Sequence, residues 1–188
     1  QFIKASPVSR ALIKMGISEI IVNTGQHYDF IMSDIFFSEL NVPKAKYNLG
    51  IGSHTHGKQT GAIISKLDDI VINEKPDAVL LYGDTNSTLS GAISASKLNI
   101  PIIHIESGLR SFNKKMPEEI NRIITDHVST LLFCPSINSK NILKNEGIIN
   151  GVFITGDVMF DIFKINQHLI KPISSNEDFA LLTMHRAE

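Results

Sequence analysis

The sequence contains very little cysteine, no tryptophan and no excess of charge of either sign. Of its 188 residues, one is cysteine and none is tryptophan, and 18 basic residues are balanced by 19 acidic ones for a net charge of −1. A single cysteine cannot form an internal disulfide, so we expect a reducing, cytoplasmic setting. A nearly neutral chain also argues against nucleic acid as a partner.

Long apolar runs are missing as well. No stretch reaches the roughly 20 apolar residues that a membrane-spanning helix needs. The first residues lack the basic start and apolar core of a secretion signal. We therefore expect no membrane partner. The chain does not begin with methionine and opens in a pattern typical of a helix, so we expect further sequence upstream.

Short apolar runs alternate with longer amphipathic stretches. The apolar runs predict parallel strands that are covered on both faces, at residues 19–24, 78–82, 101–105, 130–134, 151–155 and 179–183. Helical spacing is found between them, at about residues 2–15, 29–40, 57–74, 86–98, 117–128, 137–146 and 158–170. This alternation predicts an α/β fold with a doubly wound, Rossmann-like parallel sheet.

A polar stretch near residues 171–178 suggests a domain boundary. We predict an N-terminal Rossmann-like domain over residues 1–172. Residues 173–188 would then form a linker and the first strand of a second domain, most of which is not included in this sequence. We found no internal repeat and no low-complexity segment.

Ligands in such sheets bind beyond the carboxyl ends of the strands, so the residues that follow each strand carry most weight. Asp84 in the run Gly83-Asp84-Thr85 follows a strong strand and precedes a helix. Asp84 or Thr85 would serve as a helix cap, and Asp84 equally places a carboxylate at the edge of the sheet. The sequence leaves both interpretations open.

Glu106 ends a strand that is apolar enough to be central in the sheet, within the run from His104 to Arg110. A poorly solvated carboxylate at that position suits proton transfer. Arg110 is a candidate for gripping a phosphate. The alternative is a structural ion pair between Glu106 and Arg110.

Three further segments are weaker signals. Pro117 followed by Glu118 and Glu119 is a good helix start, which alone would explain both acids. This segment becomes a candidate site because it is the third acidic segment at these loop ends. The pairs at 185–186 and 26–27 follow predicted strands, and they suit a diphosphate and a bound ligand, respectively; the alternative for each is ordinary polar surface.

Taken together, these motifs resemble the non-hydrolysing UDP-N-acetylglucosamine 2-epimerases, in the order and close to the spacing of that family. Residues 1–4 also resemble the end of the family's N-terminal Gly-Thr-Arg-Pro-(Glu/Gln)-x-x-Lys loop. The resemblance implies the N-terminal half of a GT-B-like two-domain epimerase that lacks the first strand. It implies inversion at C2 of a UDP-sugar through a 2-acetamidoglucal intermediate.

The resemblance also implies roles for individual residues. It assigns catalysis to the carboxylates of Asp84, Glu106 and Glu118 and to the imidazole of His185. Contacts to substrate are implied for Lys4, Arg110 and Arg186, and contacts to a second, allosteric UDP-sugar for Gln26 and His27. The implied reaction needs no cofactor and no metal, and the implied assembly of the full-length protein is a homodimer.

Two departures limit the resemblance. The first strand with its Gly-Thr-Arg-Pro loop and nearly all of the C-terminal domain fall outside the 188 residues, so we expect this chain alone to be inactive. Residues 52–61 and the opening residues are closer to the branch that acts on UDP-2,3-diacetamido-2,3-dideoxyglucuronate. A GT-B glycosyltransferase and a non-catalytic binding domain are the remaining alternatives.

Overall fold

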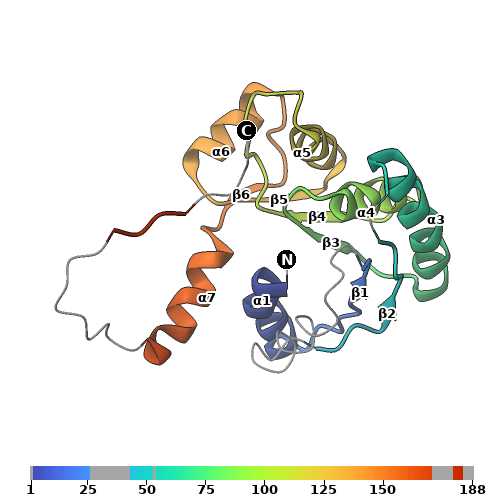
Figure 1. Cartoon of the computed structure of the whole chain (residues 1–188), viewed down its shortest axis with the longest axis horizontal. Helices are drawn as coiled ribbons and strands as arrows, with labels where there is room; N and C mark the ends of the chain where they lie inside the picture. Colours follow the sequence, from blue (N-terminus) through green and yellow to red (C-terminus); the bar gives the residue numbers. More distant parts are fainter. Residues whose placement is uncertain (1, 26–42, 53, 171–179, 184–188) are drawn as a thin grey trace.

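The computed structural model describes residues 2–25, 43–52, 54–170 and 180–183 of the chain. Helices and strands alternate along these residues, as the sequence predicts (Figure 1). In order, the elements are α1 (Phe2–Lys14), β1 (Val22–Asn23), β2 (Tyr47–Asn48), α3 (His56–Glu74), β3 (Val79–Tyr82), α4 (Asn86–Lys97), β4 (Ile102–Ile105), α5 (Pro117–Val128), β5 (Leu131–Cys134), α6 (Ile137–Asn145), β6 (Val152–Ile154), α7 (Val158–Asn166) and the short 3₁₀ helix η1 (Gln167–Leu169).

All described strand pairs are parallel. Four strands form one sheet in the order β3-β4-β5-β6, in which Tyr82 pairs with Ile105 and Ile105 with Phe133. Consecutive parallel neighbours need right-handed crossovers, which bring the connecting helices α4, α5 and α6 to one face. Helices α1 and α7 lie side by side at the other face (Figure 1). The predicted doubly wound α/β fold is confirmed.

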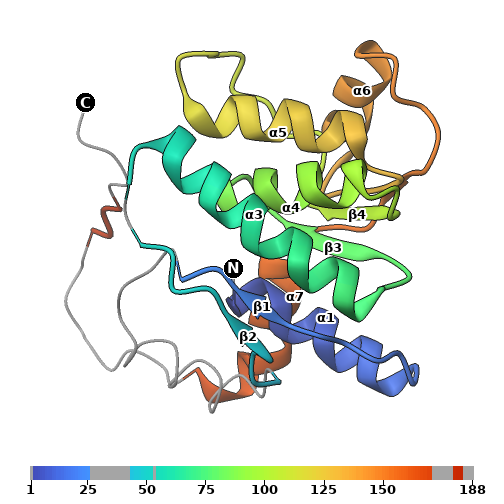
Figure 2. The ribbon, with the colours of Figure 1, turned by 90° about the vertical axis from the view of Figure 1, so that its right-hand side faces the viewer.

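The core lies between the sheet and its helices. Ala92 and Ala95 of α4 pack on Ile102 of β4, and Leu143 of α6 packs on Leu132 and Cys134 of β5. Helix α3 covers the smaller β1-β2 sheet and extends beside α4 (Figure 2). The small residues of α4 let it approach closely, because a Cβ at Gly91 would meet the side chain of Leu81 at 2.6 Å.

Local sequence explains where the helices begin. The side chains of Thr85, Ser136 and Asp157 accept hydrogen bonds from the first free amides of α4, α6 and α7, as such caps usually do. Helix α5 starts at Pro117, with two acids in its first turn. Thr85 rather than Asp84 therefore caps α4, which leaves the Asp84 carboxylate available for another contact.

The structure corrects two expectations about the sheet. The described strands form two sheets rather than one, because β1 pairs with β2, a strand that the sequence pattern did not reveal. Residues 180–183 form no strand, and Leu181 and Leu182 are exposed; no described strand pairs with them. The helix expected at residues 29–40 lies outside the described residues. Within the part of the chain that the structure describes, no helix is long and apolar enough to cross a membrane.

Candidate active site at the carboxyl ends of β3 and β4

Asp84 lies in the turn that follows β3. Gly83 adopts a positive φ of 64°, and its amide donates to the carbonyl of Ile105 on the neighbouring strand at 3.1 Å. The carboxylate of Asp84 accepts a hydrogen bond of 2.6 Å from Arg122 Nη1, and its carbonyl accepts one of 2.9 Å from Asn121 Nδ2. Two residues of α5 thus hold both the backbone and the side chain of Asp84.

Glu106 follows β4 in an unusual backbone conformation. Its φ of 71° lies in the left-handed region, which costs a residue with a Cβ roughly 1–2 kcal/mol and recurs at functional sites. The carboxylate is 15% exposed and lies 2.5 Å from the ammonium group of Lys4 on α1. This ion pair joins the opening helix to the second loop of the site.

The two glutamates at the start of α5 have different surroundings. Glu119 is 1% exposed, and it accepts the backbone amides of Ser111 and Phe112, each at 2.8 Å. Arg122 also binds it through Nε and Nη2. Glu118 is half-buried. Glu119 therefore closes the loop ahead of α5, whereas Glu118 remains the candidate for contact with substrate.

These contacts fix the charge of Glu119. Burial alone would raise its pKa, but the amide of Ser111, the guanidinium of Arg122 and the amide of Phe112 outweigh burial and lower the pKa from 4.5 to about 2. Arg122 therefore lies between a Glu119 that is charged at neutral pH and the carboxylate of Asp84. This arrangement holds Asp84 in place without a covalent or metal link.

A buried network of charged side chains lies beneath the two loops. His104 binds Asp126 of α5 at 2.7 Å, and Arg110 binds Asp126 and Glu146, also at 2.7 Å. Burial would lower the pKa of Arg110, but hydrogen bonds and charges from Glu146 and Asp126 raise it overall. The alternative pairing of Glu106 with Arg110 is wrong, because each has another partner.

The side chain of Arg110 is 1% exposed, and its donors bind Asp126, Glu146 and the Leu109 carbonyl. The contact with substrate expected for Arg110 stays a prediction, and its described contacts are structural. Four other candidates lie outside the described residues, namely Gln26, His27, His185 and Arg186.

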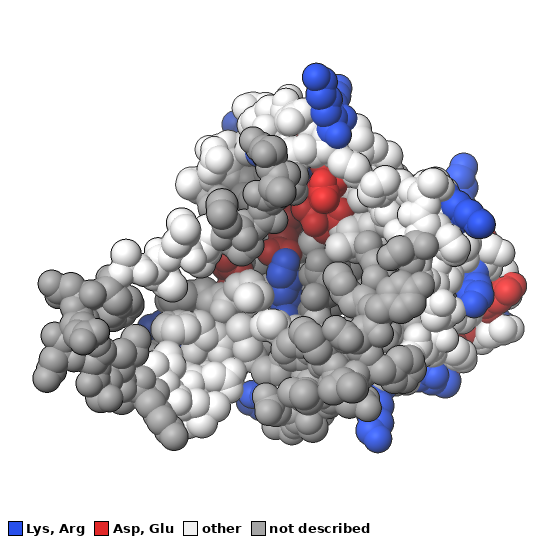
Figure 3. Space-filling view, in the orientation of Figure 1, with Lys and Arg blue, Asp and Glu red and all other residues white. Residues whose placement is uncertain are grey.

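The topology brings the candidate carboxylates to one edge of the sheet. Asp84 and Glu106 follow adjacent, in-register strands, and Glu118 lies one helical turn from Asn121 and Arg122, which bind Asp84. Figure 3 shows acidic side chains gathered in a hollow on this face, with a basic side chain against them. Within the described residues no cluster of His, Cys, Asp and Glu could hold a metal ion.

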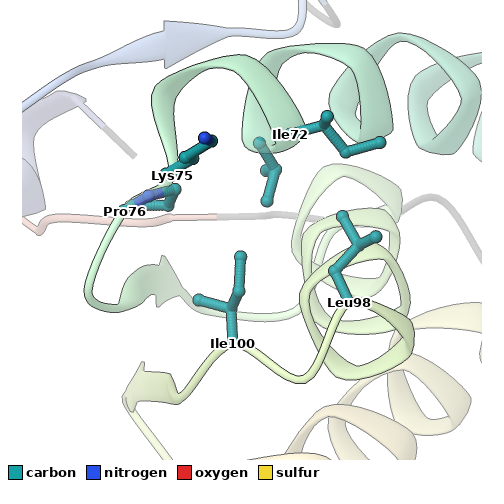
Figure 4. Close-up of a pocket in the computed structure, with 6 residues that line it drawn as sticks. Ile72, Lys75, Pro76, Leu98 and Ile100 are labelled. Atoms are coloured by element: carbon teal, nitrogen blue, oxygen red, sulfur yellow. The ribbon is translucent and has the colours of Figure 1, made fainter.

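A shallow apolar depression is found at the other end of the strands. Lys75 and Pro76, ahead of β3, and Ile100, ahead of β4, line it together with side chains of α3 and with Leu98, which follows α4 (Figure 4). It lies at the amino ends of the strands, away from the carboxylates. Because ligands of doubly wound sheets bind at the carboxyl ends, we assign no function to this depression.

The sequence reasoning missed several residues that build the site: Glu119, Asn121, Arg122, His104 and Asp126. The sequence did contain a signal for His104. His104 interrupts an otherwise apolar strand, and a buried polar group needs a hydrogen-bond partner. Its partner Asp126 lies 22 residues further along the chain, so spacing alone could not identify it.

The parallel α/β fold and the polar loops at the carboxyl ends of its strands define a doubly wound α/β domain of the kind that binds ligands at this edge. A family model described as UDP-N-acetylglucosamine 2-epimerase matches residues 11–188. The chain belongs to the UDP-N-acetylglucosamine 2-epimerase family, as the resemblance of its motifs implied.

Several relatives share this sequence over its whole length. A UDP-N-acetylglucosamine 2-epimerase homolog of Methanococcus maripaludis is 53% identical over 100% of this chain and 55% of its own length. The UDP-2,3-diacetamido-2,3-dideoxy-D-glucuronate 2-epimerase of Pseudomonas aeruginosa is also 53% identical, with the same coverage. The UDP-N-acetylglucosamine 2-epimerase of Methanocaldococcus jannaschii is 47% identical. The chain thus spans about half the length of these relatives.

Solved structures agree with this assignment. The UDP-GlcNAc 2-epimerase of Methanocaldococcus jannaschii in complex with UDP-GlcNAc and UDP superposes with a TM-score of 0.87 at 49% identity, over 90% of this chain and 47% of that one. The Neisseria meningitidis enzyme bound to UDP-GlcNAc superposes with a TM-score of 0.83 at 36% identity, over 89% and 46%. The described fold is therefore that of the GT-B-like epimerases.

Proposed function

We propose that this chain supplies the catalytic carboxylates for inversion at C2 of a UDP-sugar, converting UDP-GlcNAc to UDP-ManNAc. The single observation that carries the proposal is the placement of Asp84 and Glu106. They follow adjacent parallel strands, and each has a cationic partner, Arg122 or Lys4. Membership of the epimerase family supports the same reaction.

The reaction requires two proton transfers on opposite faces of the sugar. A carboxylate removes the C2 proton while the C1–O bond breaks and its electron pair leaves with the diphosphate, which yields UDP and 2-acetamidoglucal. UDP then adds back to C1 as an acid delivers a proton to the other face of C2. Such transfers need groups held within hydrogen-bond reach of C2, and several carboxylates around one carbon meet that need.

In this proposal Asp84, Glu106 and Glu118 share the acid and base roles. Lys4 has a second role besides orienting Glu106, because a cation beside the cleaved bond stabilises charge on departing UDP. His185 and Arg186 would act on the diphosphate, and Gln26 and His27 on a second UDP-sugar. These four assignments rest on sequence motifs.

The proposal includes the division of the protein into domains. Residues 1–172 form the N-terminal domain, and residues 173–188 lead into a C-terminal UDP-binding domain. The active site would lie between the two domains, so the 188 residues alone should not turn over substrate. We propose a cytoplasmic homodimer for the full-length protein.

The identity of the UDP-sugar substrate is the remaining part of the proposal. The 53% identity to the UDP-2,3-diacetamido-2,3-dideoxy-D-glucuronate 2-epimerase favours that sugar as a second candidate. Both substrates undergo the same chemistry at C2. Side-by-side assays of the two UDP-sugars, compared by kcat/KM, identify the preferred one.

The experiment uses a chimera in which residues 1–188 replace the matching segment of the Methanocaldococcus jannaschii UDP-N-acetylglucosamine 2-epimerase, 47% identical. The chimera is incubated with each UDP-sugar in heavy water, and the products are followed by proton NMR. We expect deuterium at C2 and the C2 epimer, both abolished by Asp84→Asn. The 188-residue chain alone should give neither.

A glycosyltransferase would give a different result. It would move the sugar to an acceptor and keep the original proton at C2, and a binding domain would leave the substrate unchanged. Transfer or hydrolysis by the chimera without exchange at C2 refutes the proposal. Turnover by the isolated 188 residues refutes the proposed need for a second domain.

A further inference from the structure

The imidazole of His104 has an oxygen acceptor at each ring nitrogen. Nδ1 lies 2.7 Å from a carboxylate oxygen of Asp126, and Nε2 lies 2.8 Å from the carbonyl oxygen of Gly83. The residue is completely buried. A carboxylate and a carbonyl can only accept, and a neutral imidazole carries hydrogen on one nitrogen only. Only the doubly protonated ring donates to both oxygens.

The surrounding charges favour that state. The Asp126 carboxylate faces the ring from α5, and Arg110 and Glu146 complete the group. With His104 charged, two cations balance two anions. Cys134 on β5 also lies near Asp126, and burial followed by the negative charge of Asp126 raises its pKa to about 11, so it stays uncharged. A buried ion group of this kind is tolerated when its charges are paired and hydrogen-bonded.

The ring connects the two loops that carry the candidate catalytic carboxylates. Its Nε2 holds the peptide directly ahead of Asp84. The other oxygen of Asp126 accepts the amide of Gly108 at 3.1 Å, two residues beyond Glu106. The carbonyl of His104 accepts Ser107 Oγ at 2.6 Å. One side chain therefore sets the spacing between the loops from inside the protein.

We propose that His104 is a doubly protonated positioning residue. Its imidazolium donates to the Gly83 carbonyl and to the Asp126 carboxylate, so that Asp84 and Glu106 face the same sugar carbon. His104 touches no substrate. The consequence for catalysis rests on the proposed function, whereas the protonation state does not. The two parts are therefore tested separately.

The first test measures the ring directly in the 188-residue chain. With ¹⁵N-labelled histidine, long-range ¹H–¹⁵N spectra separate protonated from unprotonated ring nitrogens, and His104→Gln identifies the signal. We expect two protonated nitrogens for His104 in the folded chain at neutral pH, because each faces an oxygen that can only accept. An unprotonated nitrogen on His104 in the folded chain overturns the proposal whatever the enzyme's reaction is.

The second test separates positioning from a merely structural role. Glutamine keeps an amide donor near the place of Nε2, and asparagine keeps one near Nδ1. In the chimera, we expect His104→Asn to lower kcat about 10- to 100-fold, since a shift of about 1 Å in a catalytic group costs that much. KM should change by less than about threefold, because no substrate contact is lost.

His104→Gln should retain more turnover than His104→Asn, because it still donates to the Gly83 carbonyl. Equal losses in both variants, or a rise in KM with kcat unchanged, overturn the positioning role. If the chimera shows no exchange at C2 even with His104 intact, the proposed function fails and the NMR result still decides the protonation state. If neither variant folds, the His104 signal of the unmodified chain is assigned by through-bond correlation from its backbone amide, and the same spectra still test the protonation state.

Discussion

The ammonium group of Lys4 lies 2.5 Å from the carboxylate of Glu106, although the two residues are 102 positions apart in the chain. Lys4 is in the first turn of α1, and Glu106 follows β4 on the adjoining sheet. The side chains are 22% and 15% exposed, so water screens the pair only partly. The contact ties the opening helix to the candidate active site.

Replacing Lys4 by Met should therefore impair catalysis more than folding. We expect Lys4→Met in the chimera to lower kcat about 100-fold, because a cation beside the cleaved bond is lost. Lys14→Met is the matched control, since Lys14 is exposed at the end of the same helix and should leave turnover unchanged. Steady-state assays measure kcat for both variants. Equal values would show that Lys4 has no role in catalysis.

Glu118 and Glu119 should respond in opposite ways to the same substitution. Glu119→Gln should destabilise the chain by about 3 kcal/mol, because Arg122 and the backbone amides of Ser111 and Phe112 lose their anionic partner. Glu118→Gln should cost about 1 kcal/mol or less, yet abolish exchange at C2 in the chimera. Urea unfolding and the deuterium assay measure the two effects. A stable but inactive Glu119→Gln variant would reverse the assignments.

The stability of the chain should also fall in acid because of Glu119. Its pKa is lowered from 4.5 to about 2 in the folded state, so the unfolded chain takes up the proton first. The contribution of Glu119 is complete above pH 4.5 and is lost as the pH falls towards 2. Urea unfolding between about pH 6 and pH 3 should show a steeper loss for the unmodified chain than for Glu119→Gln. Parallel curves would contradict this.

Cys134 should be unreactive while the chain is folded. It is buried, and burial together with the charge of Asp126 raises its pKa to about 11, so little thiolate is present at neutral pH. We expect a thiol reagent such as dithionitrobenzoate to react only when urea unfolds the chain. Rapid labelling of the folded chain at neutral pH would show that the thiol is accessible.

Gly108 should not tolerate a side chain, in contrast to Gly147. Both have positive φ angles, 76° and 85°, so alanine costs about 1–2 kcal/mol of backbone strain at either position. At Gly108 the added Cβ would also lie 2.4 Å from the Ser139 carbonyl oxygen, whereas at Gly147 it meets nothing within 4 Å. Thermal unfolding should show a clearly larger loss for Gly108→Ala. Equal losses would mean that the loop can move away from α6.

Local patterns were enough to predict much of the fold. Pro117 with two acids marked the start of α5, and the run at residues 101–105 marked a central strand, observed as β4, because both depend on neighbours in the chain. Parallel strands then brought Asp84 and Glu106 to one edge. Strand β2 was missed, since two residues that pair with β1 leave no periodic signal.

The sequence by itself determined the alternation of helices and strands, and it placed Asp84, Glu106 and Glu118 at loop ends, because local preference and periodicity fix both. Only the tertiary structure decided which side chains form ion pairs and hydrogen bonds with one another. Glu106 binds Lys4 rather than nearby Arg110. Successive helix residues point about 100° apart, so Glu119 is buried against amides and Glu118 is not. Ion pairs between distant residues depend on how whole elements pack, and no spacing within the chain encodes that.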